Sequence, residues 1–229
     1  MKTTIISILT LFLMYSTSYT QEETKYGFNK SDFIVAGSIS YSKGDSNSKF
    51  MSNDRQTFTS SSENKNFSLI PEVGYFLSDY FMIGTKIGYI TGKSKNYNGN
   101  ILFENKSSGY TASLFGRYYV TPKKRISLFT ELEGSYSKID SKNSRNEFLN
   151  LPSFSENEQE SYSISFAPGI NIFINQNLAL TSKIGNIGYT RSKNSFIDLE
   201  NNDTSNNKNS GFSASVNLDN FFFGFLYTI

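Results

Sequence analysis

The chain has 229 residues, enough for one domain or two small ones, and 22 basic and 20 acidic residues leave a net charge of +2. This balance gives no reason to expect nucleic acid as a partner. The absence of cysteine and histidine excludes disulfides, thiol catalysis, Ser-His hydrolases and metal sites that need these ligands, so we expect neither an enzyme nor a metal or cofactor.

The first predicted element is a signal peptide over residues 1–20. Lys2 precedes an apolar run over residues 5–14, and a polar, mostly small stretch follows at residues 16–20. The run is too short to cross a bilayer as a helix, although an N-terminal anchor remains the alternative. We expect cleavage before Gln21, which leaves one domain over residues 21–229, headed by a short polar lead.

After the lead, segments with apolar residues at every second position recur along the chain, as in half-buried strands. They predict eight strands: Phe33–Ser42, Phe67–Leu77, Phe81–Thr91, Tyr110–Val120, Ile126–Tyr136, Tyr162–Ile172, Leu178–Thr190 and Phe212–Ile229. The alternation slips near Gly185–Asn186 and near Asp219–Asn220, and the first slip predicts a β-bulge. Most of these segments match the ~9–11 residues that a tilted membrane strand needs.

The connections between the predicted strands alternate between long and short. Those at 43–66, 92–109, 137–161 and 191–211 are long and rich in Ser, Asn and Lys, whereas those at 78–80, 121–125 and 173–177 are tight. All long connections therefore lie at one end of the array, as in outer-membrane barrels with short periplasmic turns and long surface loops. We expect the long loops to be poorly ordered, because they hold little apolar area.

The composition of the two strand faces favours an apolar face that points outward, to lipid. A soluble lipid-binding barrel would carry its apolar face inside, but its exterior would then need many charges, and the polar face here is mostly Ser, Gly and Ala. A few charges lie mid-strand on the polar face, where buried charges must be paired. They predict one charge network in the lumen: Lys86, Arg117, Glu131, Glu133 and Lys183. Lys183 belongs to this network only if the predicted bulge leaves its side chain on the polar face.

Tyrosines recur near the strand ends, as in an interfacial aromatic girdle: Tyr41, Tyr75, Tyr89, Tyr110, Tyr136, Tyr162, Tyr189 and Tyr227. The general preference of tyrosine for strands contributes to this pattern. The chain also ends on alternating apolar residues, at Phe221, Phe223, Phe225, Tyr227 and Ile229. We expect this last strand to close the barrel against the first and to leave no edge unpaired.

This C-terminal pattern resembles the insertion signal of outer-membrane barrel proteins, which usually ends in Phe, whereas this chain has Ile229. The segments Pro71–Tyr89, Phe115–Val120 and Ile184–Thr190 also resemble the small outer-membrane β-barrel domain family, related in shape to outer-membrane proteins A and X. The resemblance covers nearly all of residues 21–229. It implies an all-β, eight-stranded antiparallel up-and-down barrel in the outer membrane of a Gram-negative cell, inserted by the barrel-assembly machinery.

Two functions follow from these observations. The first is a structural or surface-interaction barrel with side chains filling its lumen, where the long loops meet an extracellular ligand, through apolar residues such as Phe50, Phe58, Phe148 and Leu149. These residues could equally anchor the loops. The alternative is a narrow pore, gated by the lumen charges, for passive transport of small solutes. Known barrel enzymes depend on a catalytic His that is missing here, and a carboxylate pair such as Glu131 and Glu133 reads more simply as ion-pair partners. We expect a monomer in outer-membrane lipid.

Overall fold

The structure is a computed structural model, and it describes residues 26–51, 57–98, 101–147, 153–199, 204–215 and 224–229. The predicted signal peptide therefore lies outside the described residues. Among those described, no helix is long and apolar enough to cross a bilayer. The strands are β1 (Phe33–Met51), β2 (Thr57–Ser78), β3 (Phe81–Asn98), β4 (Ile101–Tyr119), β5 (Ile126–Glu147), β6 (Ser153–Phe173), β7 (Leu178–Lys183), β8 (Asn186–Asp198), β9 (Thr204–Ser215) and β10 (Gly224–Thr228).

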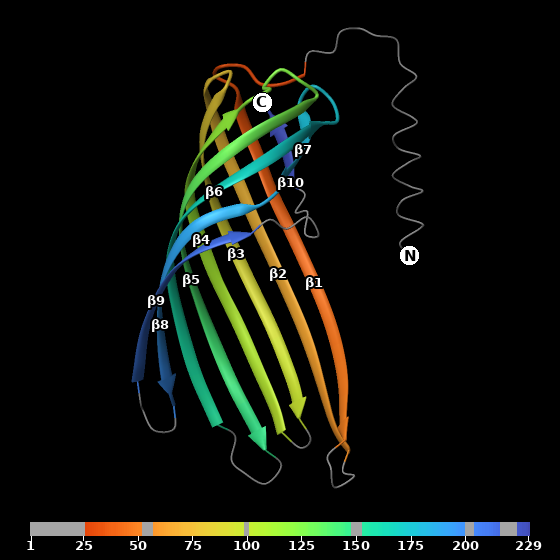
Figure 1. The fold of residues 1–229 in the computed structure, drawn as a ribbon, viewed down its shortest axis with the longest axis vertical. Coiled ribbons are helices and arrows are strands. Elements are labelled where there is room, and N and C mark those ends of the chain that lie inside the picture. Colours follow the sequence, from red (N-terminus) through yellow and green to blue (C-terminus); the bar gives the residue numbers. More distant parts are fainter. Residues whose placement is uncertain (1–25, 52–56, 99–100, 148–152, 200–203, 216–223) are drawn as a thin grey trace.

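Antiparallel pairing joins consecutive strands from β1 to β7 and closes a ring through β10, which lies between β7 and β1 (Figure 1). Within the described residues this ring contains eight strands, so the prediction of an eight-stranded antiparallel meander is confirmed. β8 and β9 form a hairpin, and β8 pairs with residues Ser155–Phe166 of β6, on the side away from the short turns. The seventh predicted strand corresponds to β7 and the start of β8, and the eighth to the end of β9 and β10.

The predicted bulge near Gly185–Asn186 lies between β7 and β8. Gly169 of β6 pairs with Lys183 and Phe166 pairs with Ile187, so three steps along β6 oppose four along its partner. One extra residue is therefore accommodated here, as in a bulge. The second predicted slip, near Asp219–Asn220, lies outside the described residues.

The described residues close the ring over a short stretch of β1. β10 pairs with β1 over Ile34–Gly37, and the rest of β1, from Ser38 to Met51, has β2 as its only partner among the described residues. Residues 216–223 of the predicted last strand lie outside the described residues, so beyond Gly37 the absence of an unpaired edge stays a prediction.

The long connections predicted as poorly ordered loops are mostly β-hairpins. β1 and β2 stay in register from Phe33–Tyr75 out to Met51–Thr57, and the β3–β4 and β5–β6 pairs extend similarly. The backbone groups of these segments form hydrogen bonds with the next strand along the chain, and this pairing needs no apolar core. Phe50 and Phe58 pair in register near one hairpin end, whereas Phe148 and Leu149 lie outside the described residues.

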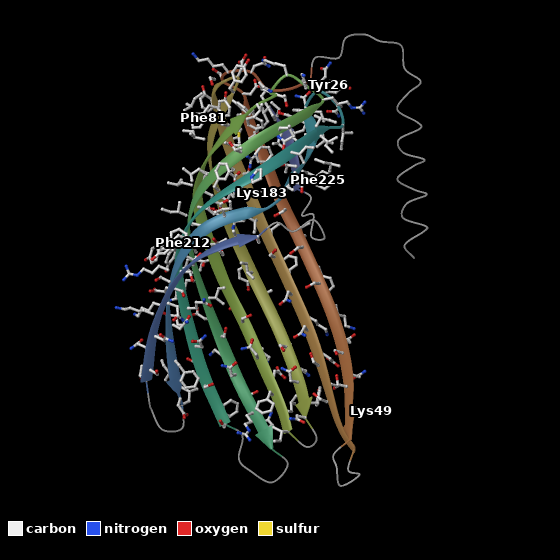
Figure 2. All side chains as sticks on the ribbon, in the orientation of Figure 1. Tyr26, Lys49, Phe81, Lys183, Phe212 and Phe225 are labelled. Atoms are coloured by element: carbon white, nitrogen blue, oxygen red, sulfur yellow. The ribbon has the colours of Figure 1, made fainter. Side chains whose placement is uncertain are left out.

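The apolar side chains on one face of every ring strand point outward. Leu114 is 72% exposed and Ile87 64% exposed, while their neighbours Ser113 and Lys86 are buried. An exposed apolar belt of this extent suits contact with lipid. The prediction that the apolar face points outward is confirmed. Figure 2 shows the side chains along the whole sheet, with Lys49 near the far end of β1.

Candidate functional site

Six ionisable side chains meet inside the ring, and we call them the charge layer: Glu72, Lys86, Arg117, Glu131, Glu133 and Lys183. They come from β2, β3, β4, β5 and β7, so the layer reaches across the lumen. Each points inward because it lies on the strand face opposite the apolar belt. Three bases and three acids leave no formal net charge in the layer (3 − 3 = 0).

Arg117 is the centre of the charge layer. Its Nε and Nη2 donate to Glu131 Oε2 at 2.9 and 2.6 Å, and Nη2 also donates to Glu72 Oε1 at 2.8 Å. Arg117 and Glu131 are each about 1% exposed. The guanidinium carbon lies 4.5 Å from the centre of the Phe129 ring. Arg117 is thus held by two carboxylates and by the rings of Phe129 and Phe115, which fixes its position in the lumen.

Two lysines complete the charge layer from opposite sides. Lys86 Nζ lies 2.7 Å from Glu131 Oε1 and 2.6 Å from Glu133 Oε2. Lys183 Nζ pairs with Glu131 and lies 3.0 Å from Glu133 Oε2. Because β7 lies across the ring from β3, these contacts link opposite walls of the barrel.

The structure therefore brings all five residues of the predicted lumen network together, and it adds Glu72. Glu72 lies in register with Lys86 and shares Arg117 with Glu131. Sequence reasoning missed it, although its even position on a strand whose apolar residues are odd, such as Val73, places it on the polar face. The alternation of apolar and polar residues along this strand was therefore enough to predict that Glu72 points into the lumen.

A cluster of aromatic side chains fills the ring next to the charge layer, toward the short turns. We call it the aromatic plug: Phe28, Phe76, Tyr119, Phe129 and Phe173. Phe28 is fully buried and lies 4.5 Å from Phe76, 4.7 Å from Tyr119 and 5.1 Å from Phe173, measured between ring centres. Arg117 Nη1 donates to the Tyr119 hydroxyl at 3.3 Å, which joins the plug to the charge layer.

Phe28 belongs to the lead, which sequence reasoning described as only polar. The backbone N–H of Phe28 donates to Pro122 O at 3.1 Å, and that of Ser31 donates to Phe76 O at 2.9 Å. Gly27 has a φ of 108°, and a Cβ there would lie 2.0 Å from Pro122 O, so glycine is required. The lead thus turns into the ring and inserts one aromatic side chain.

Asp79, in the turn between β2 and β3, holds the lead from outside. Its carboxylate accepts the backbone N–H of Lys30 at 2.7 Å and lies 3.2 Å from Lys123 Nζ. The bond from Lys30, and next the contact with Lys123, lower the pKa of Asp79 from its ordinary value near 3.8. An ionised Asp79 therefore favours the docked lead.

The predicted C-terminal signal is only partly described. Phe225, Tyr227 and Ile229 are more than half exposed on the lipid-facing side, whereas Leu226 points into the ring. Phe221 and Phe223 lie outside the described residues. In the described ranges, no group of three or more carboxylate, His or Cys side chains is arranged to hold a metal ion.

Comparison with known proteins places the chain among outer-membrane barrels. The model of the OmpA-like transmembrane domain family matches residues 34–211. The structure is similar to that of OprG from Pseudomonas aeruginosa, with 14% identity, a TM-score of 0.53 and coverage of 89% of this chain and 98% of that one. A major outer membrane protein from Thermus thermophilus has 9% identity, a TM-score of 0.45 and coverage of 87% and 99%. No curated protein matches the sequence.

Proposed function

The chain belongs to the OmpA-like transmembrane domain family and lies in the bacterial outer membrane, and from this premise we propose that it is a closed barrel with a structural or surface-interaction role. The observation that carries the proposal is that side chains fill the inside of the ring. The charge layer spans the lumen, and the aromatic plug fills the space beside it. An eight-stranded ring has room for side chains and little more, so we expect no continuous water path.

The proposed role outside the membrane belongs to the hairpins. The short turns, such as residues 79–80 and 120–125, face the periplasm, and the long hairpins extend from the cell surface. β1 alone has 19 residues, or roughly 60 Å at the usual strand rise, about twice what a membrane strand requires. The outer half of the sheet is therefore the surface on which an extracellular ligand would bind.

The same proposal includes insertion by the barrel-assembly machinery and a role without enzymatic activity. The lipid-facing Phe225 and Tyr227 on β10 support recognition of the last strand by the barrel-assembly machinery. The carboxylates of the charge layer are occupied by Lys and Arg, which supports a non-enzymatic role. The proposed form in the membrane is a monomer surrounded by lipid, after removal of residues 1–20.

Labelling of introduced cysteines on intact cells tests the surface role, because the native chain contains no cysteine. Asn47→Cys lies on the exposed outer part of β1, and Lys124→Cys lies in an exposed short turn. We expect a membrane-impermeant maleimide to label Asn47→Cys and to reach Lys124→Cys only after lysis. Labelling of Lys124→Cys on intact cells would contradict the proposed orientation.

A further inference from the structure

A row of outward-facing aromatic residues marks the edge of the apolar belt on the hairpin side. Their rings lie close together on neighbouring strands: Tyr136 and Tyr162 are 5.0 Å apart between centres, and Tyr189 and Phe212 are 4.9 Å apart. This girdle consists of Tyr41, Phe67, Tyr89, Tyr110, Tyr136, Tyr162, Tyr189 and Phe212. Aromatic girdles lie at the level of the lipid headgroups.

Directly beyond this girdle, four lysines stand side by side on the outer face of β1–β4. Lys43 pairs in register with Lys65, Lys65 with Lys93, and Lys93 with Lys106. We call these four residues the lysine row. Lys43 and Lys65 each lie two residues beyond a girdle aromatic, roughly 7 Å along the strand. Like charges directly opposite each other destabilise a sheet, so a bound anion would stabilise the row.

The chain itself supplies too few carboxylates to neutralise the lysine row. Lys93 and Lys106 share Glu104, at 3.1 and 3.0 Å, and Lys95 approaches the same carboxylate at 3.9 Å. Lys43 reaches Asp45 at 3.5 Å. Within the described ranges, no carboxylate lies within 4.0 Å of Lys65 Nζ.

The adjoining β5–β6 hairpin does not share this excess. The outer face of the β1–β4 hairpins carries six lysines and three carboxylates (6 − 3 = +3), at Lys43, Lys49, Lys65, Lys93, Lys95, Lys106, Asp45, Glu63 and Glu104. On β5–β6 the same face carries two lysines, each paired with a glutamate: Lys138 with Glu158 at 2.7 Å and Lys142 with Glu156 at 2.9 Å. Asp140 and Glu160 add two more acids there, so the face is acidic (2 − 4 = −2).

We propose that the lysine row binds the phosphate groups of a phosphorylated glycolipid in the outer leaflet of the membrane. Three observations combine in this assignment: the row adjoins the girdle, it lies outside the apolar belt, and its positive charge exceeds its own carboxylates. A lipid whose chains contact the belt would place its phosphates at this height. The inference rests on the proposed outward orientation of the hairpins.

Native mass spectrometry of the refolded barrel in detergent, titrated with bisphosphorylated lipid A, tests this inference. The wild-type protein should bind it more tightly than dephosphorylated lipid A. Because each lysine near an anionic surface contributes about 1 kcal/mol, the double variant Lys43→Gln/Lys65→Gln should bind the phosphorylated lipid roughly 30-fold more weakly. Lys43→Arg/Lys65→Arg keeps the charge and should retain binding.

Lys49→Gln/Lys142→Gln is the matched control, because it removes two charges from exposed sites on the same face that are farther from the girdle. It should bind like the wild-type protein. Equal weakening in the control, or equal affinity of the wild-type protein for both forms of lipid A, would overturn the proposal. Competition by inorganic phosphate at equal affinity would overturn the assignment to a lipid. Lipid binding by the barrel in detergent does not depend on how the protein is oriented in a membrane. Cysteine labelling on intact cells therefore tests the proposed function separately from this inference.

Discussion

At the scale of single residues, the charge layer depends on how its carboxylates share their cationic partners. Glu131 is nearly inaccessible, yet it contacts Arg117, Lys86 and Lys183. Glu72 has Arg117 as its near partner at 2.8 Å, with Lys86 at 3.9 Å. Removing one partner from such a network costs more than the network itself contributes, because a charge stays buried without compensation.

Arg117→Ala should therefore destabilise the barrel strongly. It leaves three carboxylates with two lysines and deprives Glu72 of its near partner, at a cost of about 3–5 kcal/mol. The urea midpoint of the folded barrel in detergent measures the loss. The matched control is Lys142→Ala, whose pair with Glu156 is exposed and should contribute at most about 1 kcal/mol. Equal midpoints for Arg117→Ala and the wild-type protein would show that the layer is not a stabilising network.

The pKa of Asp79 predicts how pH affects the lead. Because folding lowers this pKa, the contribution of the Asp79 carboxylate to docking is complete above the ordinary value near 3.8. It is lost as the pH falls through the lowered value. The NMR shift of the Lys30 amide should therefore change at acidic pH, and Asp79→Asn should abolish this titration. A Lys30 amide that titrates identically in both proteins would contradict the assignment.

At the scale of elements, each long strand has two parts with different stabilising interactions. Near the short turns, the strands bury the plug and the charge layer. Farther out, they hold one another through backbone pairing and exposed polar contacts, such as the 2.7 Å hydrogen bond from the Ser195 hydroxyl to Asn206 Oδ1. The outer parts should therefore be dispensable for the ring.

Shortening one hairpin tests this separation. Replacement of residues 44–64 by Asn-Gly would join the register partners Lys43 and Lys65 through a two-residue turn. Because the pairs from Phe33–Tyr75 to Tyr41–Phe67 remain, the variant should keep the compact, heat-modifiable band of a folded barrel on an unheated SDS gel. Loss of this band would show that the outer hairpins are needed for folding.

The alternation of apolar and polar residues was sufficient to predict the strands of the ring and which face of each strand points outward. It did not predict the outer hairpins or the position of Phe28, which depend on contacts with neighbouring strands. Lys86, Arg117 and Glu131 were recognised because each is a charged residue in the middle of a strand, on the face that the apolar alternation marks as polar. The outer hairpins were missed because Ser, Asn and Lys favour loops in isolation, and only pairing with the adjacent strand makes them extended. Phe28 was missed because two aromatic residues in a polar lead, Tyr26 and Phe28, are too few to show a periodicity. The position of Phe28 depends on the ring that receives it.

At the scale of the whole molecule, the described strands form a closed ring near the short turns and a longer sheet beyond it. The plug and the charge layer lie near the short turns, where β10 joins β1 to β7. Beyond Gly37, the described strands form a curved sheet in which β1 and β9 are the outermost members (Figure 1). The described strands thus combine a ring filled by side chains with a long polar sheet, which the proposed orientation places at the cell surface.

Single-channel conductance in a planar bilayer tests the central claim, that the charge layer and the plug close the lumen. The wild-type barrel, shown to be folded by its unheated band, should pass no steady current. The double variant Phe28→Ala/Arg117→Ala, if its band is retained, should conduct, because it removes one side chain from each barrier. Steady conductance of the wild-type protein that changes when Arg117 or Glu131 is replaced would contradict the claim and identify a narrow pore gated by the charge layer.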